Sequence, residues 1–229
     1  MELEQWKTEA LFDLEGKSAG AYLTRFLYPW EALGGIGAWI REYAATLSRE
    51  EYEEVAPGAF VSKRARVAPT AYLGEGCIVE AGAEVRHGAY IRGNAFIGKG
   101  SVVGNSTEVK NAILIERVEV PHYNYVGDSI FGTGAHLGAG AIASNLKCDG
   151  SNVWLHTAEG KFPTGLRKFG AILGDGAQVG CNAVLCPGCL VGKGAVIYPL
   201  VRVRGVVPAQ TLQKSETVQV SLCMEGDAK

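Results

Sequence analysis

Aliphatic side chains recur at every sixth position through most of the chain. From Pro57 onward the sequence divides into hexads whose fifth place is aliphatic and whose third place is small in nine of the first ten. Those aliphatic places are Val61, Val67, Leu73, Val79, Val85, Ile91, Ile97, Val103, Val109 and Ile115. The pattern is less regular through Val126, Phe131 and Leu137, after a one-residue slip near Pro121. It returns at Leu173, Val179, Leu185, Val191, Ile197 and Val203.

A six-residue period predicts one short strand followed by one corner. Residues two apart on a strand face the same side, so the third and fifth places of each hexad both point inward. The next three positions turn the corner, where glycine is useful. Three such sides close a coil of 18 residues, and successive coils stack at about the 4.8 Å strand spacing. The sequence therefore predicts an all-β fold, a parallel β-helix of hexapeptide repeats.

Interruptions of the six-residue period divide the chain. Residues 1–56 lack the period, and a Tyr-Pro-Trp-Glu opening at Tyr28 followed by apolar residues at helical spacing predicts a helical N-terminal cap over the first coil. Residues 57–206 form the β-helix. Within them, residues 146–170 break the period and read as a hairpin-like excursion loop, which is either a solvated loop or a carrier of binding residues. Residues 207–229 form a C-terminal tail.

Composition and charge narrow the class of protein. Glycine accounts for 31 of 229 residues, about twice the average usage, as a repeat with many tight corners requires. The net charge of −2 gives no global field for nucleic acid or an anionic membrane. The sequence has no signal-peptide pattern and no apolar run long enough to span a bilayer. Six cysteines in a chain of this length suit reduced thiols, so we expect a cytoplasmic protein.

Two cations stand one full coil apart. Arg92 and Lys110 both occupy the sixth place of their hexads, 18 residues apart, which predicts that they stack on one edge within about 5 Å. Two cations so close repel each other unless an anion lies between them. The pair therefore suggests a phosphate clamp, although two splayed and solvated side chains remain an alternative.

Several spaced polar motifs resemble a known family. The stretches from Gly104 to Asn111 and from Pro121 to Asp128, then Gly138-Ala139-Gly140 and Asn145, resemble the acetyltransferase domain of the bifunctional enzyme that makes UDP-N-acetylglucosamine. That domain is a left-handed β-helix and acetylates glucosamine 1-phosphate with acetyl-CoA. The resemblance is close over about residues 86–145. The family's Gly-rich, Lys-bearing nucleotidyltransferase opening has no equivalent in residues 1–56, so we expect no uridylyl transfer.

The resemblance implies roles for individual residues. His122 matches the general base, a task that suits an imidazole because the attacking amine must be unprotonated. Arg92 and Lys110 match the pair that holds the sugar phosphate. Tyr125 and Asn145 match positions that contact the substrate, and His136 stands where the bacterial domain often has Asn. The amide of Ala139 matches an acetyl-CoA contact, and backbone amides near Asn145 or Cys181 are candidates for binding the oxyanion.

The resemblance also implies an assembly and leaves the sugar open. It implies a homotrimer with sites between adjacent prisms, acetyl-CoA as co-substrate, and no metal in the transfer. The family's downstream lysine aligns with Val153, and Lys147 or Lys168 is a candidate replacement. The excursion and residues 167–175 look more like archaeal sugar-1-phosphate acetyltransferase domains, which accept a wider set of amino sugars.

Three other interpretations remain. Cys181, Cys186 and Cys189 imitate an iron–sulfur spacing, but the period places Cys189 inside and the other two at corners, which argues against a cluster. A zinc carbonic anhydrase of the same fold needs three imidazoles, and the four histidines include no closely spaced pair. The third interpretation is a catalytically silent protein that binds a sugar phosphate or nucleotide sugar, or acts as a scaffold.

Overall fold

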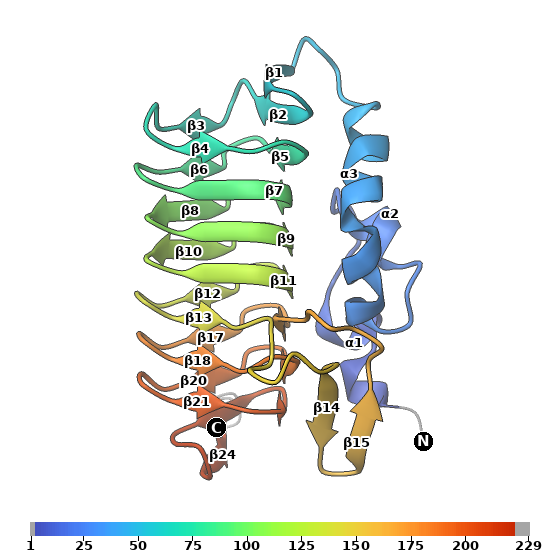
Figure 1. Ribbon diagram of the computed structural model, residues 1–229, viewed down its shortest axis with the longest axis vertical. Coiled ribbons are helices and arrows are strands. Elements are labelled where there is room, and N and C mark those ends of the chain that lie inside the picture. The colour runs from blue at the N-terminus through green and yellow to red at the C-terminus, as the bar shows by residue number, and fades with distance from the viewer. Residues whose placement is uncertain (1–2, 223–229) are drawn as a thin grey trace, which may run out of the picture.

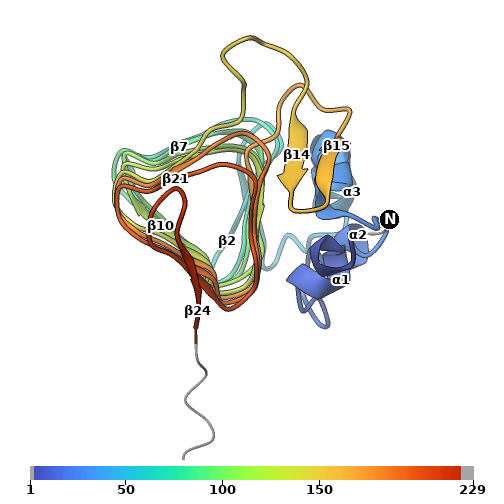
Figure 2. The ribbon, with the colours of Figure 1, turned by 90° about the horizontal axis from the view of Figure 1, so that it is seen from below.

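A three-sided solenoid makes up most of the molecule. The computed structural model describes residues 3–222, and the view along the solenoid axis shows a triangular outline (Figure 2). Short strands stack as parallel pairs from one coil to the next (Figure 1). Small and aliphatic side chains point inward and form one continuous core from Ala59 to Val207. The predicted parallel β-helix of hexapeptide repeats is confirmed.

The strands define three faces. Face A consists of β2 (Ala59–Ser62), β5 (Cys77–Val79), the second halves of β7 (Tyr90–Ile97), β9 (Glu108–Leu114) and β11 (Tyr125–Phe131), then β16 (Ala171–Leu173), β19 (Cys189–Val191) and β22 (Val206–Val207). Face B consists of β3 (Arg66–Val67), β6 (Glu84–Val85), β8 (Val102–Asn105), β10 (Glu119–His122), β12 (His136–Leu137), β17 (Gln178–Val179), β20 (Val196–Ile197) and β23 (Thr211–Gln213). Face C consists of β4 (Tyr72–Leu73), the first halves of β7, β9 and β11, then β13 (Ile142–Ala143), β18 (Val184–Leu185) and β21 (Arg202–Val203).

The edge between faces C and A, here called edge CA, sets the length of the coils. At this edge β7, β9 and β11 bend at Asn94, Asn111 and Asp128, which have φ values of 48°, 47° and 48°. Asn and Asp tolerate this left-handed conformation better than most residues. Two residues turn the corner between Val109 and Ala112, whereas three turn it between Ile91 and Ala95. Coils therefore shorten from 18 residues to 17, as in the pairing of Val109 with Val126.

The shortened coils change the position at which the six-residue pattern slips by one residue. The aliphatic positions inside the core step from Val109 to Leu114 and from Val126 to Phe131, five residues each time. The predicted inward position of Ile115 is wrong. Leu114 occupies the core, and Ile115 packs in a second apolar cluster outside the prism. The slips occur at edge CA and not near Pro121, because edge CA is where a corner loses a residue.

Face A has apolar side chains on both of its surfaces. Its outward side chains are Phe60, Ile78, Phe96, Ile113, Ile130, Ile172, Leu190 and Val206. They pack against the N-terminal segment and the excursion. The N-terminal elements are η1 (Glu4–Trp6), α1 (Thr8–Leu11), α2 (Gly20–Leu23), η2 (Pro29–Gly35) and α3 (Ile36–Ala44). An apolar sheet surface must be covered, so the helical segment lies along the side of the prism (Figures 1 and 2).

Helix α3 lies close to the prism through its aromatic face. The ring of Phe96 is fully buried, with centroids 5.1 Å from Trp39 and 5.8 Å from Tyr43. The predicted start with proline in the first turn is confirmed, since η2 begins at Pro29 and Glu31 accepts a hydrogen bond from the Tyr28 amide at 3.0 Å. Gly37 lies against the Asn94 side chain, where a Cβ would not fit.

The two open ends of the solenoid are closed by antiparallel strands. At the N-terminal end β1 (Tyr52–Ala56) pairs with β2, and it covers the first coil in place of the helices expected there. At the other end, the parallel ladder continues past residue 206 to β23, and β24 (Gln219–Ser221) pairs with β23. Residues 223–229 of the predicted tail lie outside the described residues. None of the helices in residues 3–222 has the length and apolar character to cross a membrane.

The excursion contains the predicted hairpin. Strands β14 (Trp154–Thr157) and β15 (Gly160–Pro163) are antiparallel, and Trp154 pairs with Pro163. Val153, Leu155 and Phe169 are buried in the cluster that covers face A. The excursion therefore continues the cover that the N-terminal helices begin, on the lower coils of the prism (Figure 1).

We predict that the cover of face A contributes strongly to stability. Phe96→Ala should lower the free energy of unfolding by about 3–5 kcal/mol, because a fully buried ring is lost and a cavity remains. Urea denaturation followed by circular dichroism measures this change. Leu200→Ala is the control, since Leu200 is 78 % exposed and its loss should change stability by less than about 0.5 kcal/mol. Equal losses for the two variants would contradict the prediction.

Candidate active site

Polar side chains gather on edge CA near the middle of the prism. Arg92 donates to Glu108 at 2.8 Å, and Lys110 donates to Asp128 at 3.2 Å. Asn145 lies one coil further on and also donates to Asp128. Four of the predicted substrate-binding residues, Arg92, Lys110, Tyr125 and Asn145, thus lie on or beside one edge. The structure brings these four together.

The stacking predicted for Arg92 and Lys110 is out of register by one residue. Lys110 pairs with Gly93, and the ladder shifts between Ile91 and Gly93, so Arg92 occupies a bulge at the corner. Each cation also has its own carboxylate, Glu108 for Arg92 and Asp128 for Lys110. The repulsion that was predicted to require a bound anion is therefore largely balanced within the protein. The hydrogen bond and charge of Glu108 raise the pKa of Arg92.

Asp128 is the centre of the polar cluster. It is 6 % exposed, and its carboxylate accepts hydrogen bonds from Lys110, from Asn111 at 2.9 Å, and from Asn145. A buried carboxylate requires this number of donors. Asn111 also donates to the Leu33 carbonyl at 3.2 Å, which joins the cluster to the helical segment. The position of Asp128 thus determines where Lys110 and Asn145 are held.

Tyr125 lies beside Asn145 at the same edge. Burial raises the pKa of Tyr125, and the nearby charges of Glu108 and Asp128 raise it further. A hydrogen bond with Asn145 and the charge of Arg92 act in the opposite direction. The tyrosine therefore stays protonated near neutral pH. It presents a hydroxyl, next to a carboxamide, that can donate to or accept from a sugar.

A cavity of about 400 Å³ opens next to this cluster and contains an additional cation. Its lining includes Arg92 and Lys110, and Arg41 of α3 reaches it from the opposite side. Arg41 forms no ion pair or side-chain hydrogen bond with any residue between 3 and 222, and Glu75 lines the same cavity. Sequence analysis missed Arg41 because the hexad period carries no information about which edge the helix lies against.

His122 lies on a different edge from the polar cluster. The edge between faces B and C, here called edge BC, carries His122, Ala139 and Cys181 on successive coils. The His122 carbonyl accepts from Gly140 at 2.9 Å, Ala139 from Asn182 at 2.8 Å and Cys181 from Leu200 at 2.9 Å. The His122 side chain is exposed. Edge CA begins at Gly127. The Cα atoms of His122 and Gly127 are at most about 17 Å apart, which is the length of the extended chain between them.

His136 is separated from the polar cluster on edge CA. It lies on β12 of face B, half-buried, with Glu119 and Gln178 as its neighbours in the ladder. Face B does not include edge CA. The structure therefore does not bring His136 together with the other substrate-binding candidates.

The excursion places one of the two lysine candidates beside Asn145. Val153, which aligns with the family's lysine, is buried in the apolar cover of face A. Lys147 turns back to Ser151 and Asp149 of its own loop. Lys168 forms a β-bridge with Leu146, and the next amide, that of Phe169, donates to the Asn145 carbonyl at 2.9 Å. The backbone of Lys168 thus lies close to that of Asn145, and its side chain is exposed.

The cysteines follow the predicted register. Cys189 lies inside the core, and its thiol donates to the Val203 carbonyl at 3.0 Å. Cys181 is exposed at edge BC, and Cys186 is half-buried. Burial raises the pKa of both Cys186 and Cys189. Among residues 3–222, no three His, Cys, Asp or Glu side chains form a group with metal-binding geometry.

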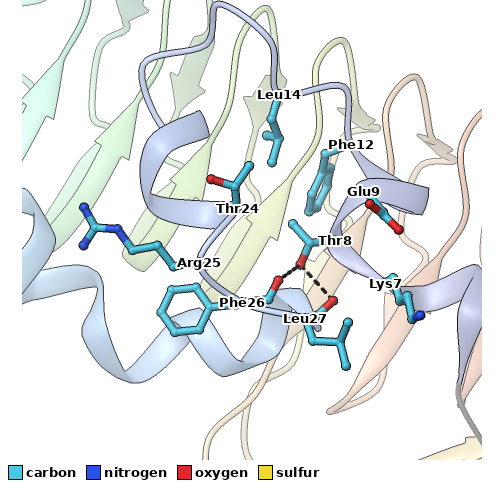
Figure 3. Close-up of a pocket in the computed structure, with 9 residues that line it drawn as sticks. All are labelled: Lys7, Thr8, Glu9, Phe12, Leu14, Thr24, Arg25, Phe26 and Leu27. Carbon is cyan, nitrogen blue, oxygen red and sulfur yellow. Dashed lines mark hydrogen bonds between the residues drawn. The ribbon is translucent and has the colours of Figure 1, made fainter.

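Another cavity, of about 470 Å³, lies within the N-terminal segment (Figure 3). Thr8 and Phe12 line it on one side, and Thr24, Arg25 and Phe26 on the other (Figure 3). Thr8 donates to the Phe26 carbonyl at 2.8 Å, and Arg25 donates to the Ala21 carbonyl at 3.0 Å. The side chains of Thr8 and Arg25 thus bond to the segment's own backbone and are not free to bind a ligand.

Comparison with known proteins supports the predicted resemblance over the middle of the chain. A family model described as the GMPPB C-terminal domain matches residues 73–158. A bifunctional sugar-1-phosphate nucleotidylyltransferase/acetyltransferase of Sulfurisphaera tokodaii is 34 % identical over 90 residues, which are 39 % of this chain and 22 % of the relative. The bifunctional protein GlmU of Methanococcus vannielii is 38 % identical over 88 residues, or 38 % of this chain and 21 % of that protein.

These curated relatives are much longer than the matched region, and the chain spans about a fifth of their length. Among solved structures, the polySia-specific acetyltransferase NeuO covers 72 % of this chain and 83 % of its own, with 16 % identity and a TM-score of 0.43. PerB from Caulobacter crescentus, in complex with CoA and GDP-perosamine, covers 67 % of this chain and 52 % of its own, with 21 % identity and a TM-score of 0.32. The resemblance to an acetyltransferase domain, made first on the sequence motifs, is confirmed by the matches in sequence over the middle of the chain.

We predict that Asp128 holds the cluster together. Asp128→Asn removes the charge that Lys110 and two carboxamides are oriented toward, and should lower the free energy of unfolding by about 1.5–3 kcal/mol. Chemical denaturation measures this loss. Glu84→Gln is the matched control, because Glu84 forms partly exposed pairs with Arg66 and Arg86 that contribute about 1 kcal/mol or less. A smaller loss for Asp128→Asn than for the control would refute the assignment.

Proposed function

We propose that the chain is an acetyl-CoA-dependent N-acetyltransferase that acts on an amino-sugar 1-phosphate. The observation that carries this proposal is the gathering of Tyr125, Asn145, Lys110 and Arg92 on edge CA, at positions that match the amino-sugar acetyltransferase domain. Relatives that include an acetyltransferase match the same region of the sequence. Acetyl-CoA is the donor that the resemblance to this acetyltransferase domain implies.

The residues of edge CA suit an amino sugar. The hydroxyl of Tyr125 and the carboxamide of Asn145 offer donors and acceptors for sugar hydroxyl groups. Arg41, Arg92 and Lys110 line the adjacent cavity together with Glu75. Since Arg92 and Lys110 have carboxylate partners within 4 Å and Arg41 has none, Arg41 is the cation that would hold a phosphate there.

The chemistry assigned to His122 is that of a general base. The sugar amine attacks the thioester carbonyl of acetyl-CoA, and a nitrogen–carbon bond forms as the carbon–sulfur bond breaks. His122 takes the proton that the amine loses, and CoA leaves as the thiol after receiving a proton. Backbone amides near Cys181 on edge BC, or near Asn145 on edge CA, would donate to the oxyanion of the tetrahedral intermediate.

The separation of the two edges supports a site built between copies of the chain. His122, Ala139 and Cys181 lie on edge BC, whereas Tyr125 and Asn145 face edge CA. Face C, between them, has an exposed apolar stripe. Its members include Tyr72, Tyr90, Ile142 and Val184, which are 60 %, 44 %, 38 % and 36 % exposed. Covering this stripe with a neighbouring prism would bring edges of two chains together, as in the proposed trimer.

We predict that His122→Ala lowers the acetylation rate roughly a hundred- to ten-thousand-fold, with little change in KM, because only proton transfer is lost. The assay follows the CoA thiol released from acetyl-CoA with several amino-sugar 1-phosphates. His87→Ala is the control, because His87 is an exposed imidazole on the same edge BC, two coils from His122, and it bonds to Thr70. An unchanged rate would remove His122 from the mechanism. Sugar-phosphate binding without any thiol release would favour a silent binding protein.

A second prediction concerns the site between copies. His122→Ala and Asn145→Ala chains should each be inactive alone, and co-expression should restore activity toward about one quarter of the wild-type value. Random assembly places an intact edge BC beside an intact edge CA in one of four combinations. Thiol release from the purified mixed oligomer measures the recovery. Sites contained within single chains would give no recovery, since every chain lacks one of the two groups.

A further inference from the structure

A cationic cavity with an aromatic wall lies below the proposed acetylation site, and no step proposed above uses it. It has a volume of about 750 Å³ and opens between the excursion and the lower coils. Leu146 and Trp154 line it from the excursion, and Val184 and Arg204 line it from the solenoid. Ser144, which adjoins Asn145, also lines it. The cavity therefore continues along edge CA from the polar cluster.

Positive charge exceeds negative charge in this cavity. Lys147, Lys161, Arg202 and Arg204 line it, and Asp149 is the carboxylate among the lining residues. Lys147 pairs with Asp149 at 3.4 Å, and Arg202 pairs with Glu216 at 2.7 Å. Lys161 and Arg204 make no ion pair or side-chain hydrogen bond with any part of the chain from residue 3 to residue 222. Two full charges thus face the cavity without a compensating group.

His156 lines the cavity together with these cations. Burial lowers the pKa of His156, and the charges of Arg204, Lys161 and Lys147 lower it further. Three cations from the loop, the hairpin and the last coils line the same cavity as this side chain. Holding like charges together is unfavourable unless a bound anion offsets the repulsion.

The exposed aromatic side chain in the cavity, Trp154, sets a second requirement for the ligand. Trp154 is 45 % exposed on β14, whereas Trp6, Trp30 and Trp39 are buried. Leu146 and Val184, which are 41 % and 36 % exposed, extend the apolar surface. An exposed indole beside uncompensated cations suits a ligand that has both a flat ring and phosphate groups. Inorganic phosphate or a simple sugar phosphate would leave the indole uncovered.

We infer that this cavity binds a nucleoside carrying two phosphates, with the base on Trp154 and the phosphates on Lys161 and Arg204. Stacking of a base on an aromatic side chain and pairing of phosphate with Lys and Arg are the interactions available here. Two sources share this chemistry. One is the 3′,5′-bisphosphate end of CoA, and the other is the 5′-diphosphate of a nucleotide-activated sugar. The inference rests on this cavity and does not require acetyl transfer.

Tryptophan fluorescence of the full chain tests the inference directly, since Trp154 is the exposed indole. UDP, GDP and adenosine 3′,5′-bisphosphate should be titrated in turn, with pyrophosphate as the probe without a base. We expect saturable quenching by at least one nucleotide, and about tenfold weaker binding of pyrophosphate measured by calorimetry. Tight binding of adenosine 3′,5′-bisphosphate identifies CoA as the source, and tight binding of UDP or GDP identifies a nucleotide sugar.

Variants of the two free cations complete the test. Lys161→Ala and Arg204→Ala should each weaken nucleotide binding about tenfold or more, because each removes a charged contact to phosphate. The double variant should also show a shallower salt dependence. Arg66→Ala is the control, since Arg66 is an exposed cation on face B. The exposed positions of Lys161 and Arg204 leave the fold intact, which urea denaturation checks.

The outcomes separate this inference from the proposed acetylation. Unchanged nucleotide binding in the double variant, or no binding of any nucleotide at millimolar concentration, would overturn the cavity assignment even with full acetylation activity. Pyrophosphate binding as tight as that of the nucleotides would overturn the role of Trp154. Nucleotide binding that depends on Lys161 and Arg204 would stand even if thiol release were never observed.

Discussion

Each coil of this protein must return to lie in register over the previous coil. Parallel pairing fixes the length of a coil within one residue, because backbone groups of one strand can bond only to aligned groups of the next. The interior of the triangle admits small and aliphatic side chains, which accounts for the Ala, Cys and Ser positions two residues before most of the core aliphatic residues. Once coil length is fixed, the three edges become straight columns. Residues far apart in sequence then meet on one edge, as Lys110, Asp128 and Asn145 do.

A column of corner residues controls both the coil length and the candidate site. Asn94, Asn111 and Asp128 have positive φ values on successive coils of edge CA. The conformation that turns the corner also directs their side chains toward one another and toward the helical segment, as the bonds of Asn111 to Asp128 and to Leu33 show. The shortened corner brings Lys110 opposite Gly93 and leaves Arg92 in the bulge. Structure and chemistry at this edge therefore depend on the same backbone feature.

The sequence was sufficient to predict the solenoid, the hairpin and the helix start at Pro29, because each follows from local spacing. It was also sufficient to place Cys189 inside and Cys181 at a corner. It could not predict that Ile115 leaves the core, because a five-residue step and a six-residue step both end on an apolar residue there. Nor could it predict where the helices lie. The outward Phe96, Ile113 and Ile130 indicate that face A is covered, but this signal is visible only after the outward and inward positions have been distinguished. Arg41 depends on that placement and was missed for the same reason.

The distribution of charge along edge CA distinguishes two kinds of anion environment. In the middle of the edge, Glu108 and Asp128 neutralise Arg92 and Lys110. This region, which also contains Tyr125, therefore favours the hydroxyl groups of a ligand over a strongly charged ligand. Above and below it, Arg41 on the one side and Lys161 with Arg204 on the other form no ion pair within the described chain. Both groups come from, or lie against, the segments that break the hexad period. The repeat thus supplies a nearly neutral central platform, and the non-repetitive segments supply the charge at its two ends. An elongated ligand set with phosphates at both ends and a sugar in the middle fits this order better than one compact anion.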